Sequence, residues 1–238
     1  VVDFYESYRA FVRGKVASLL ASDRFASADA RERARREARR YFLLALAFER
    51  PPLVSPQVVA VGGMIASGKS HTATAIGDYL AAPVLGSDRT RKRLMGHEPK
   101  VRLDGGAWSG AYSEGATEAV YAELLRVGDM VLSSRRPLVL DASFRSAEQR
   151  AAARSLARRH GVPFLFGECQ APPAVLNERL TAREVAGTHE SDARSDLLEA
   201  FEARFEPVDE LDSSEHLRID TSQSIETTRH ALEAAFRD

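Results

Sequence analysis

Residues Gly63 to Ser70 form the part of the sequence whose types and spacing most clearly indicate chemistry. They read Gly-Met-Ile-Ala-Ser-Gly-Lys-Ser and fit the pattern G-x-x-x-x-G-K-[ST]. Glycines let backbone N–H groups turn inward around a polyphosphate, where a Cβ would obstruct them. The lysine supplies a point charge for the β- and γ-phosphates, and the serine hydroxyl can bind Mg²⁺. The motif therefore predicts a loop that binds a nucleoside triphosphate with Mg²⁺.

The residues on either side of this motif meet its structural requirements. The apolar run Val58–Val61 predicts a buried strand before the loop, and Lys69–Leu80 has the pattern of an amphipathic helix after it. The positive end of such a helix would point at the bound phosphates. A chance match in a glycine-containing loop would not require this context. The predicted nucleotide site consists of Gly63, Ala66, Ser67, Gly68, Lys69, Ser70 and His71.

Asp141 follows the predicted strand Leu138–Leu140 directly, and ligands of open parallel sheets bind beyond the carboxyl ends of the strands. A carboxylate there can hold Mg²⁺, usually through water, so Ser70 and Asp141 are the predicted metal residues. The alternative is that Asp141 is only the N-cap of a following helix. The next residue is Ala142, where an AAA-type motor would usually carry a glutamate to activate water, so the sequence disfavours a fast ATPase motor.

Asp88 comes shortly after the predicted strand Pro83–Gly86, where an acceptor hydroxyl would approach the γ-phosphate. A carboxylate in that place can accept the hydroxyl proton and orient the nucleophile. Arg91 lies one helical turn further on and can hold an anionic acceptor group or the transferred phosphate. The alternative is an exposed acid that caps a helix rich in arginine and lysine.

Arg179 and Arg183 are spaced i, i+4 and share one face of a predicted helix over Pro172–Arg183. The polar stretch Glu184–Glu190 behind them is a candidate lid, and arginines on a lid can neutralise a transferring phosphoryl group. Spacing alone narrowly favours an ordinary amphipathic helix with exposed arginines.

The elements that would position these residues alternate along the chain from Gln57 onward. Five apolar runs predict strands, and the segments between them predict helices, which indicates an α/β sandwich with a five-stranded parallel sheet. The further strands are predicted at Pro163–Phe166 and His216–Ile219. The further helices are predicted at Ser113–Ser134, Ser146–His160, Asp192–Phe205 and Ser224–Phe236.

Residues 1–50 have a different character and predict a hairpin of two helices, Asp3–Leu20 and Ala26–Glu49. The second begins with a run of arginines, which is either the solvated face of a long helix or a patch for nucleic acid or phosphate. Prolines 51, 52 and 56 then break the helix. We therefore predict a helical segment over 1–50 and a P-loop domain over 51–238, with a lid near 179–192.

Composition excludes several classes of protein. With 33 Lys and Arg against 34 Asp and Glu, the net charge of −1 gives no global bias toward nucleic acid. One cysteine, Cys169, excludes an intramolecular disulfide framework. No apolar run approaches a membrane span and no signal peptide is visible, so we expect a cytoplasmic protein without a membrane partner.

From Val58 onward the sequence resembles P-loop kinases of the zeta-toxin and polynucleotide-kinase type. It resembles more closely the C-terminal ATP-binding domain of bacterial bifunctional aminoglycoside phosphotransferase/ATP-binding proteins. The resemblance implies ATP rather than GTP, Asp88 as general base, Arg91 as an acceptor-side or phosphate contact, and lid roles for Arg179 and Arg183. The matching segments are Gly62–Ser70, Ser87–Leu94, Leu140–Phe144, Arg179–Arg183 and Ser191–Ala193.

The stretch Asp3–Val16 is similar to the last helices of the phosphotransferase-like half of that family. The H-G-D-x-x-x-x-N catalytic loop of that half does not occur in this sequence. The resemblance implies that residues 1–50 are a helical remnant, or a docking element for an upstream phosphotransferase-like domain or a partner.

These observations predict an ATP-dependent phosphotransferase whose acceptor is a hydroxyl of a small molecule or nucleotide-like compound. Its catalytic residues would be Lys69, Asp88, Arg91, Arg179 and Arg183. One alternative is a polynucleotide 5′-hydroxyl kinase, which predicts a basic groove from Arg91, Lys92 and Arg93 to the lid and salt-sensitive binding of single strands. The other is a regulatory module that binds ATP or hydrolyses it slowly.

Overall fold

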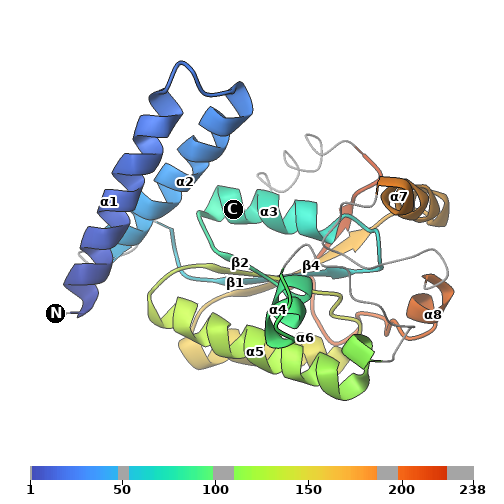
Figure 1. The fold of residues 1–238 in the computed structure, drawn as a ribbon. Coiled ribbons are helices and arrows are strands. Elements are labelled where there is room, and N and C mark those ends of the chain that lie inside the picture. Colours follow the sequence, from blue (N-terminus) through green and yellow to red (C-terminus); the bar gives the residue numbers. More distant parts are fainter. Residues whose placement is uncertain (1, 48–53, 99–109, 187–197, 224–238) are drawn as a thin grey trace.

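The computed structural model describes residues 2–47, 54–98, 110–186 and 198–223, and these contain a five-stranded parallel sheet (Figure 1). The strand order is β2-β3-β1-β4-β5. Helix α3 (Lys69–Leu80) covers one face, and α5 (Glu114–Ser133) and α6 (Ala147–His160) cover the other. The predicted α/β sandwich is confirmed. The strands are β1 (Val58–Gly63), β2 (Val84–Gly86), β3 (Leu138–Asp141), β4 (Phe164–Gln170) and β5 (His216–Asp220).

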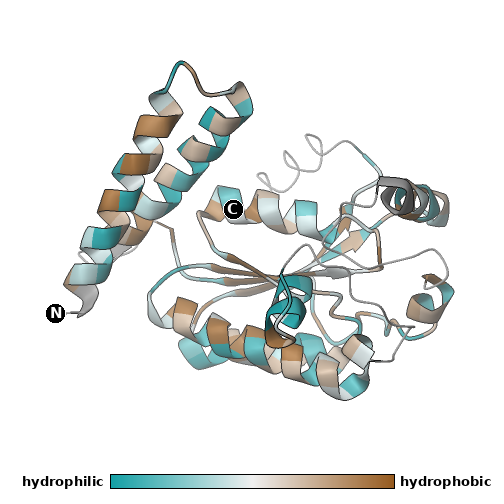
Figure 2. Ribbon diagram, viewed as in Figure 1, coloured by the Kyte–Doolittle hydropathy of each residue, from teal (hydrophilic) through white to brown (hydrophobic). Residues whose placement is uncertain are grey.

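The predicted N-terminal hairpin is also present, as α1 (Val2–Ser22) and α2 (Ala28–Ala47). The two helices meet through small side chains, because Ala10, Ala17, Ala34 and Ala38 are all buried between them. A Cβ placed on Gly14 would lie 2.8 Å from the ring of Phe42, so the backbones approach closely. Figure 2 shows that α1 also carries several strongly hydrophobic residues.

The arginine run of α2 attaches the hairpin to the end of α3. Arg40 Nη2 lies 2.6 Å from Asp78 Oδ1, and Arg36 Nε lies 3.3 Å from Asp78 Oδ2. Arg39 donates to the main-chain carbonyl of Asp78 at 3.0 Å. Positive charge at a helix C-terminus complements the partial negative charge of its free carbonyls. These arginines are therefore more than a solvated face, because three of them hold one helix end.

The sheet has a core on each side because β1 is buried on both faces, as in most parallel sheets. Val58 and Ala60 pack with side chains of α5 and α6, whereas Val59 and Val61 pack against α3. All four are fully buried. A third cluster joins Ile65 to Leu176 and Leu180 of α7 (Pro173–Ala186) and to Leu198 of α8 (Leu198–Glu202).

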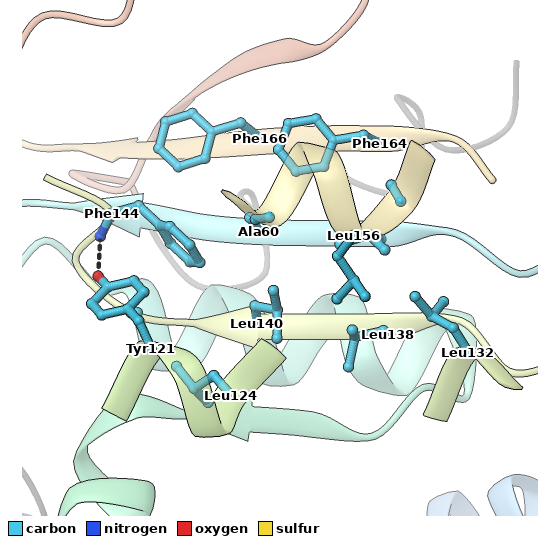
Figure 3. Close-up of a cluster of buried hydrophobic side chains, with 14 of the residues drawn as sticks. Ala60, Tyr121, Leu124, Leu132, Leu138, Leu140, Phe144, Leu156, Phe164 and Phe166 are labelled. Carbon is cyan, nitrogen blue, oxygen red and sulfur yellow. Dashed lines mark hydrogen bonds between the residues drawn. The ribbon is translucent and has the colours of Figure 1, made fainter. Parts of the chain in front are cut away.

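The turn after β3 is held in an unusual backbone conformation. Phe144 has a φ of 46°, in the left-handed region that non-glycine residues rarely adopt. Its N–H donates to the hydroxyl of Tyr121 at 2.9 Å, as Figure 3 shows within the surrounding hydrophobic cluster. Its carbonyl accepts from Arg150 at 3.0 Å. Both main-chain groups of the strained residue are thus paired, which fixes the path of the chain just beyond Asp141.

Arg150 is a fully buried arginine that ties this turn to the segment after α8. Its guanidinium pairs with both carboxylate oxygens of Glu210 and donates to the carbonyls of Glu206 and Pro207. A buried charge is tolerated only when it is paired and hydrogen-bonded, and this one is. The side chain therefore joins three segments that are distant in sequence.

Several predicted elements differ from the observed ones. Helix α4 (Ser87–Leu94) and the short 3₁₀ helix η1 (Gly110–Tyr112) were not among the predicted helices. The predicted helix Asp192–Phe205 is described only as α8. The lid prediction is described only over α7, because 187–197 lie outside the described residues, as does the predicted helix at Ser224–Phe236. Within the described residues, no helix is both long and apolar enough to span a membrane.

We predict that Arg150→Met lowers the free energy of unfolding by about 3 kcal/mol, because it leaves three carbonyls and Glu210 without their donor. Urea unfolding followed by circular dichroism would measure the change. Arg158→Met is the matched control, since Arg158 lies on the exposed side of the same helix and should change stability by less than about 0.5 kcal/mol. Equal effects of the two substitutions would contradict a structural role for the Arg150 network.

Candidate functional site

The loop between β1 and α3 has the backbone that its motif requires. Gly63 has a φ of 130° and Gly68 a φ of 85°, both unfavourable for L side chains. A Cβ on Gly63 would also lie 2.3 Å from the carbonyl oxygen of Cys169, at the end of β4. Glycine is therefore needed at position 63 for two independent reasons, backbone angle and the close approach of β4. Ala66 also has a positive φ, of 60°.

Thr221, directly after β5, supports the loop from behind. It is buried, and its hydroxyl lies 2.7 Å from the carbonyl of Ser67 and 3.0 Å from that of Gln170. Since a hydroxyl has one proton, the shorter contact to Ser67 is the donated bond. The main-chain N–H of Thr221 also donates to Gln170 at 2.9 Å. The end of β5 thus holds the back of the loop against the end of β4.

Arg179 of α7 adds to this support. Its guanidinium donates to the carbonyls of Ala66 and Thr221 and lies 3.4 Å from the Thr221 hydroxyl. The structure therefore places the predicted lid arginine Arg179 at the loop itself. The partner predicted with it, Arg183, lies one turn further along α7, and its side chain is outside the described residues.

Lys69, Ser70 and His71 begin α3 at the open side of the loop. The Lys69 Nζ atom donates to the carbonyl of Met64 at 2.6 Å, which brings the ammonium group over the loop. Ser70 and His71 are exposed, whereas Ser67 is fully buried and its hydroxyl has no hydrogen-bond partner among the described residues. A glycine-containing loop at a helix N-terminus, with a nearby ammonium and an exposed serine, fits a magnesium-bound polyphosphate.

Asp141 is the buried carboxylate of the site. Burial raises its pKa above the usual value, opposed by a hydrogen bond from Ser70 and by the positive charges of Lys69, Arg89 and His71. Ser70 and Asp141, the two predicted metal residues, are therefore in contact. The described residues contain no cluster of three His, Cys, Asp or Glu for a metal. This fits Mg²⁺, which keeps several waters and binds through one or two protein groups and the phosphates.

Asp88 lies in the first turn of α4, two residues after β2, and is half-buried. Gly86 of β2 pairs in register with Asp141 of β3. A Cβ placed on Gly86 would be 3.8 Å from the Asp141 carboxylate. The fold thus brings the segment with Asp88 next to Asp141, the predicted metal carboxylate, at the carboxyl end of the sheet.

Arg91 is buried behind Asp88. Its Nη1 donates to the carbonyl of Ala111 at 2.6 Å, and its guanidinium stacks over the ring of Tyr112 at 4.6 Å. Only 5% of the residue is exposed, and its Nε has no hydrogen-bond partner among the described atoms. The stack connects α4 to η1, so Arg91 is held in one orientation.

The basic groove predicted for a polynucleotide kinase is not formed by its three named residues. Lys92 is 1% exposed and Arg91 is 5% exposed, so neither offers its charge to a strand at the surface. Arg93 is exposed but pairs with Glu123 at 2.7 Å. These residues join α4 to its neighbours rather than lining a groove.

The comparisons with known proteins agree with this geometry. Residues 58–208 match the family model described as AAA domain, which covers more than half of the chain. The chain belongs to this AAA domain family. An uncharacterized protein of Mycobacterium tuberculosis is 32% identical over 225 residues, covering 92% of this chain and 41% of that protein. The chain therefore spans about two-fifths of the length of the curated relatives it matches.

Solved structures with this AAA domain fold include kinases. A sugar kinase of Janibacter sp. superimposes with a TM-score of 0.54 at 16% identity, over 76% of this chain and 93% of that one. The Mycobacterium tuberculosis APS kinase, solved with AMPPNP and APS, gives a TM-score of 0.53 at 23% identity, over 77% and 99%. At these identities the likeness concerns the fold alone. It is a fold that these kinases share.

Three residues at the site were missed by sequence reasoning. Ser143 accepts the N–H of Gly63 at 3.1 Å, Arg89 places its charge near Asp141, and Thr221 holds the loop. A signal for Thr221 was present, because it is a polar residue just past a strand, the criterion that found Asp141. For Ser143 and Arg89 the sequence offers no comparable signal.

We predict that Asp141→Asn raises the melting temperature of the domain in buffer without nucleotide or metal. Because burial raises the folded-state pKa, ionising Asp141 costs stability once the pH exceeds the unfolded value of about 4. The cost is absent below that pH and complete above the folded pKa. Differential scanning calorimetry at pH 7.5 should show a gain on the order of a few degrees, which shrinks toward pH 4.

The matched control for this prediction is Asp220→Asn. A hydrogen bond from Ser222 lowers the pKa of Asp220, so its ionised form favours the folded state above pH 4. Its removal should lower the melting temperature at pH 7.5 rather than raise it. A decrease for Asp141→Asn as well would show that burial is not the dominant influence on Asp141.

We predict that Thr221→Val weakens ATP binding by about tenfold, because valine keeps the shape but leaves the carbonyl of Ser67 without its donor. Thr221→Ser keeps the hydroxyl and should bind within about threefold of the parent. Isothermal titration calorimetry with ATP and Mg²⁺ would give both affinities. Equal affinities for the valine and serine variants would mean that the hydroxyl does not hold the loop.

Proposed function

We propose that this AAA domain is an ATP-dependent phosphotransferase that moves the γ-phosphate to a hydroxyl of a small-molecule or nucleotide-like acceptor. The observation that carries the proposal is the placement of two carboxylates beyond neighbouring strands. Asp141 lies against Ser70 of the phosphate-binding loop, and Asp88 follows the adjacent strand β2. One carboxylate is thus available for the metal and the other for the acceptor.

The nucleotide part of the site would be formed by the loop and the start of α3. The N–H groups of the loop and the N-terminus of α3 would hold the phosphates, with Lys69 at the β- and γ-phosphates. Ser70 and Asp141 would hold Mg²⁺, which neutralises phosphate charge when bound. Asp141 is kept next to Ser70 by the strand pairing, so this arrangement exists before nucleotide binds.

Asp88 would act as the general base. In the proposed transfer, the acceptor oxygen forms a bond to the γ-phosphorus while the bond to the ADP oxygen breaks, and the hydroxyl proton passes to the Asp88 carboxylate. Its place in the first turn of α4, half-buried, gives it one side toward solvent, from which an acceptor can approach. The products are ADP and the phosphorylated acceptor.

The arginines would handle charge around the transfer. Arg91 is fixed by Ala111 and Tyr112 and has an unpaired buried Nε, which supports an acceptor-side contact with an anionic group. Arg179 already lies at the loop, where a small movement would bring it to a phosphate. Arg183 is proposed to act with it from the next turn of α7.

Three observations favour this proposal over the alternatives. Ala142 follows Asp141, so a fast motor lacks its usual water-activating glutamate at that position. The burial of Arg91 and Lys92 and the pairing of Arg93 remove the basic groove expected of a polynucleotide kinase. The similar folds of a sugar kinase and an APS kinase support a small acceptor.

We predict that Asp88→Asn reduces phosphate transfer at least 100-fold and leaves the affinity for ATP within about threefold, because the residue acts on the acceptor rather than the nucleotide. Labelled γ-phosphate would be followed from ATP into a pool of sugars, nucleosides and other alcohols, with Lys69→Ala as the blank. A 5′-hydroxyl oligonucleotide would be tested in parallel.

The matched control is Asp129→Asn, an exposed acid on α5 that pairs with His160 outside the site and should leave transfer unchanged. Transfer by Asp88→Asn at the parental rate would show that another group is the base. Release of free phosphate alone, in the presence of every acceptor, would contradict the phosphotransferase proposal and support a slow ATPase.

A further inference from the structure

The outer face of α1 exposes an unusual amount of apolar surface. Side chains on this face are exposed by 40% to 71%, and they recur at helical spacing along five turns. Single exposed hydrophobic residues are common, but a contiguous set on one helix marks an interaction surface. We call this set the α1 stripe, and it consists of Phe4, Tyr5, Tyr8, Phe11, Val12, Val16, Leu19 and Leu20.

The hairpin itself does not use the α1 stripe. The face of α1 that contacts α2 is made of small residues, with Ala10 and Ala17 buried and Gly14 against Phe42. Ser7 adds a hydrogen bond to the carbonyl of Ala45 at 3.0 Å. Phe11 lies at the border of the two faces, with its ring 5.9 Å from that of Phe42, and it is still 48% exposed. The other large apolar residues of the stripe are 40% to 71% exposed. One face of α1 therefore packs against α2, and most of the α1 stripe on the other face is not covered by any of the described residues.

The sheet domain does not cover the stripe either. Polar contacts between the sheet domain and the hairpin run from Arg36, Arg39 and Arg40 to Asp78. On α1, Glu6, which is outside the stripe, lies within electrostatic range of Arg136. In Figure 1, α2 lies between α1 and α3, so α1 is on the side of the hairpin away from the sheet. The hydrophobic residues of α1 in Figure 2 thus lie at the periphery of the described molecule.

The curated relatives show what accompanies such a hairpin. The Mycobacterium tuberculosis relative matches 92% of this chain, and the unmatched remainder is shorter than the hairpin, so the match extends into it. The same match accounts for only 41% of that relative. The relatives therefore carry at least part of the hairpin together with more than an equal length of further chain, which is enough for at least one additional domain.

We propose that the α1 stripe is an interface with a second folded domain of the same polypeptide, which presents an apolar groove to the helix. From Phe4 to Leu20 the stripe extends about 24 Å along the axis, a length suited to an interdomain contact of about 600–1,500 Å². The aromatic half, Phe4 to Phe11, and the aliphatic half, Val12 to Leu20, would fit two differently shaped parts of that groove. This inference is independent of the chemistry proposed for the site.

Accessibility of the stripe to a thiol reagent tests the proposal. Val16→Cys would be labelled with a water-soluble maleimide in the 238-residue chain and in the complete polypeptide that naturally contains this sequence. The native Cys169 does not interfere, because it is buried and burial raises its pKa to about 11. We expect Val16→Cys to react at least tenfold more slowly in the complete polypeptide.

The matched control is Met130→Cys, since Met130 is an apolar residue of α5 that is 60% exposed, similar to Val16 at 63%. It should react at the same rate in both proteins. Equal rates for Val16→Cys in both, or a natural polypeptide with no chain beyond these residues, would overturn the proposal. Protection of Val16→Cys already in the 238-residue chain, with a dimer in sedimentation velocity, would overturn it in favour of a second copy.

Discussion

The rest of this domain depends on the shape of one backbone loop, residues 63–68. The contacts that hold this loop come from the ends of neighbouring strands and from α7. Gly63 approaches the carbonyl of Cys169 too closely for any side chain, and its N–H is bonded to Ser143. Thr221 and Arg179 hold the carbonyls of Ser67 and Ala66. The ends of β3, β4 and β5 thus each contribute a contact that fixes the conformation of the loop.

The site illustrates a conflict between stability and function. The buried guanidinium of Arg150 is hydrogen-bonded to Glu210 and to three carbonyls, so it stabilises the folded state. Asp141 is buried beside only one hydrogen-bond donor, Ser70, and its ionised form is disfavoured until a cation arrives. The proposed metal role would supply the positive charge that the fold does not. Arg150 differs because its charge is already paired within the protein.

The sequence predicted the sheet and the loop because both have strong local signals. The Gly63–Ser70 motif and the buried run Val58–Val61 are read within a few residues, and Asp141 follows from its place after a strand. Helix α4 was not among the predicted helices, because Ser87–Leu94 is short and has only one large apolar residue. It forms because Arg91 and Lys92 bury their stems and Arg93 pairs with α5.

Other features were beyond sequence reasoning because they depend on contacts far apart in the chain. Thr221 acts on Ser67, 154 residues earlier, and Arg150 acts on Glu210, 60 residues later. The spacing of apolar residues in α1 predicted the helix correctly. The same spacing did not indicate that the small residues would face α2 and that most of the large ones would face solvent. A hydrophobic pattern marks an apolar face but does not identify what packs against that face.

Helix α3 has a consequence for how the two parts of the chain communicate. Its first residues belong to the phosphate-binding loop, and its last turn carries Asp78, which three arginines of α2 grip. Twelve residues make a rod of about 18 Å. A short straight helix bends little, so α3 connects the hairpin at one end rigidly to the loop at the other. A displacement of α2 would therefore reach the loop of residues 63–68 through α3.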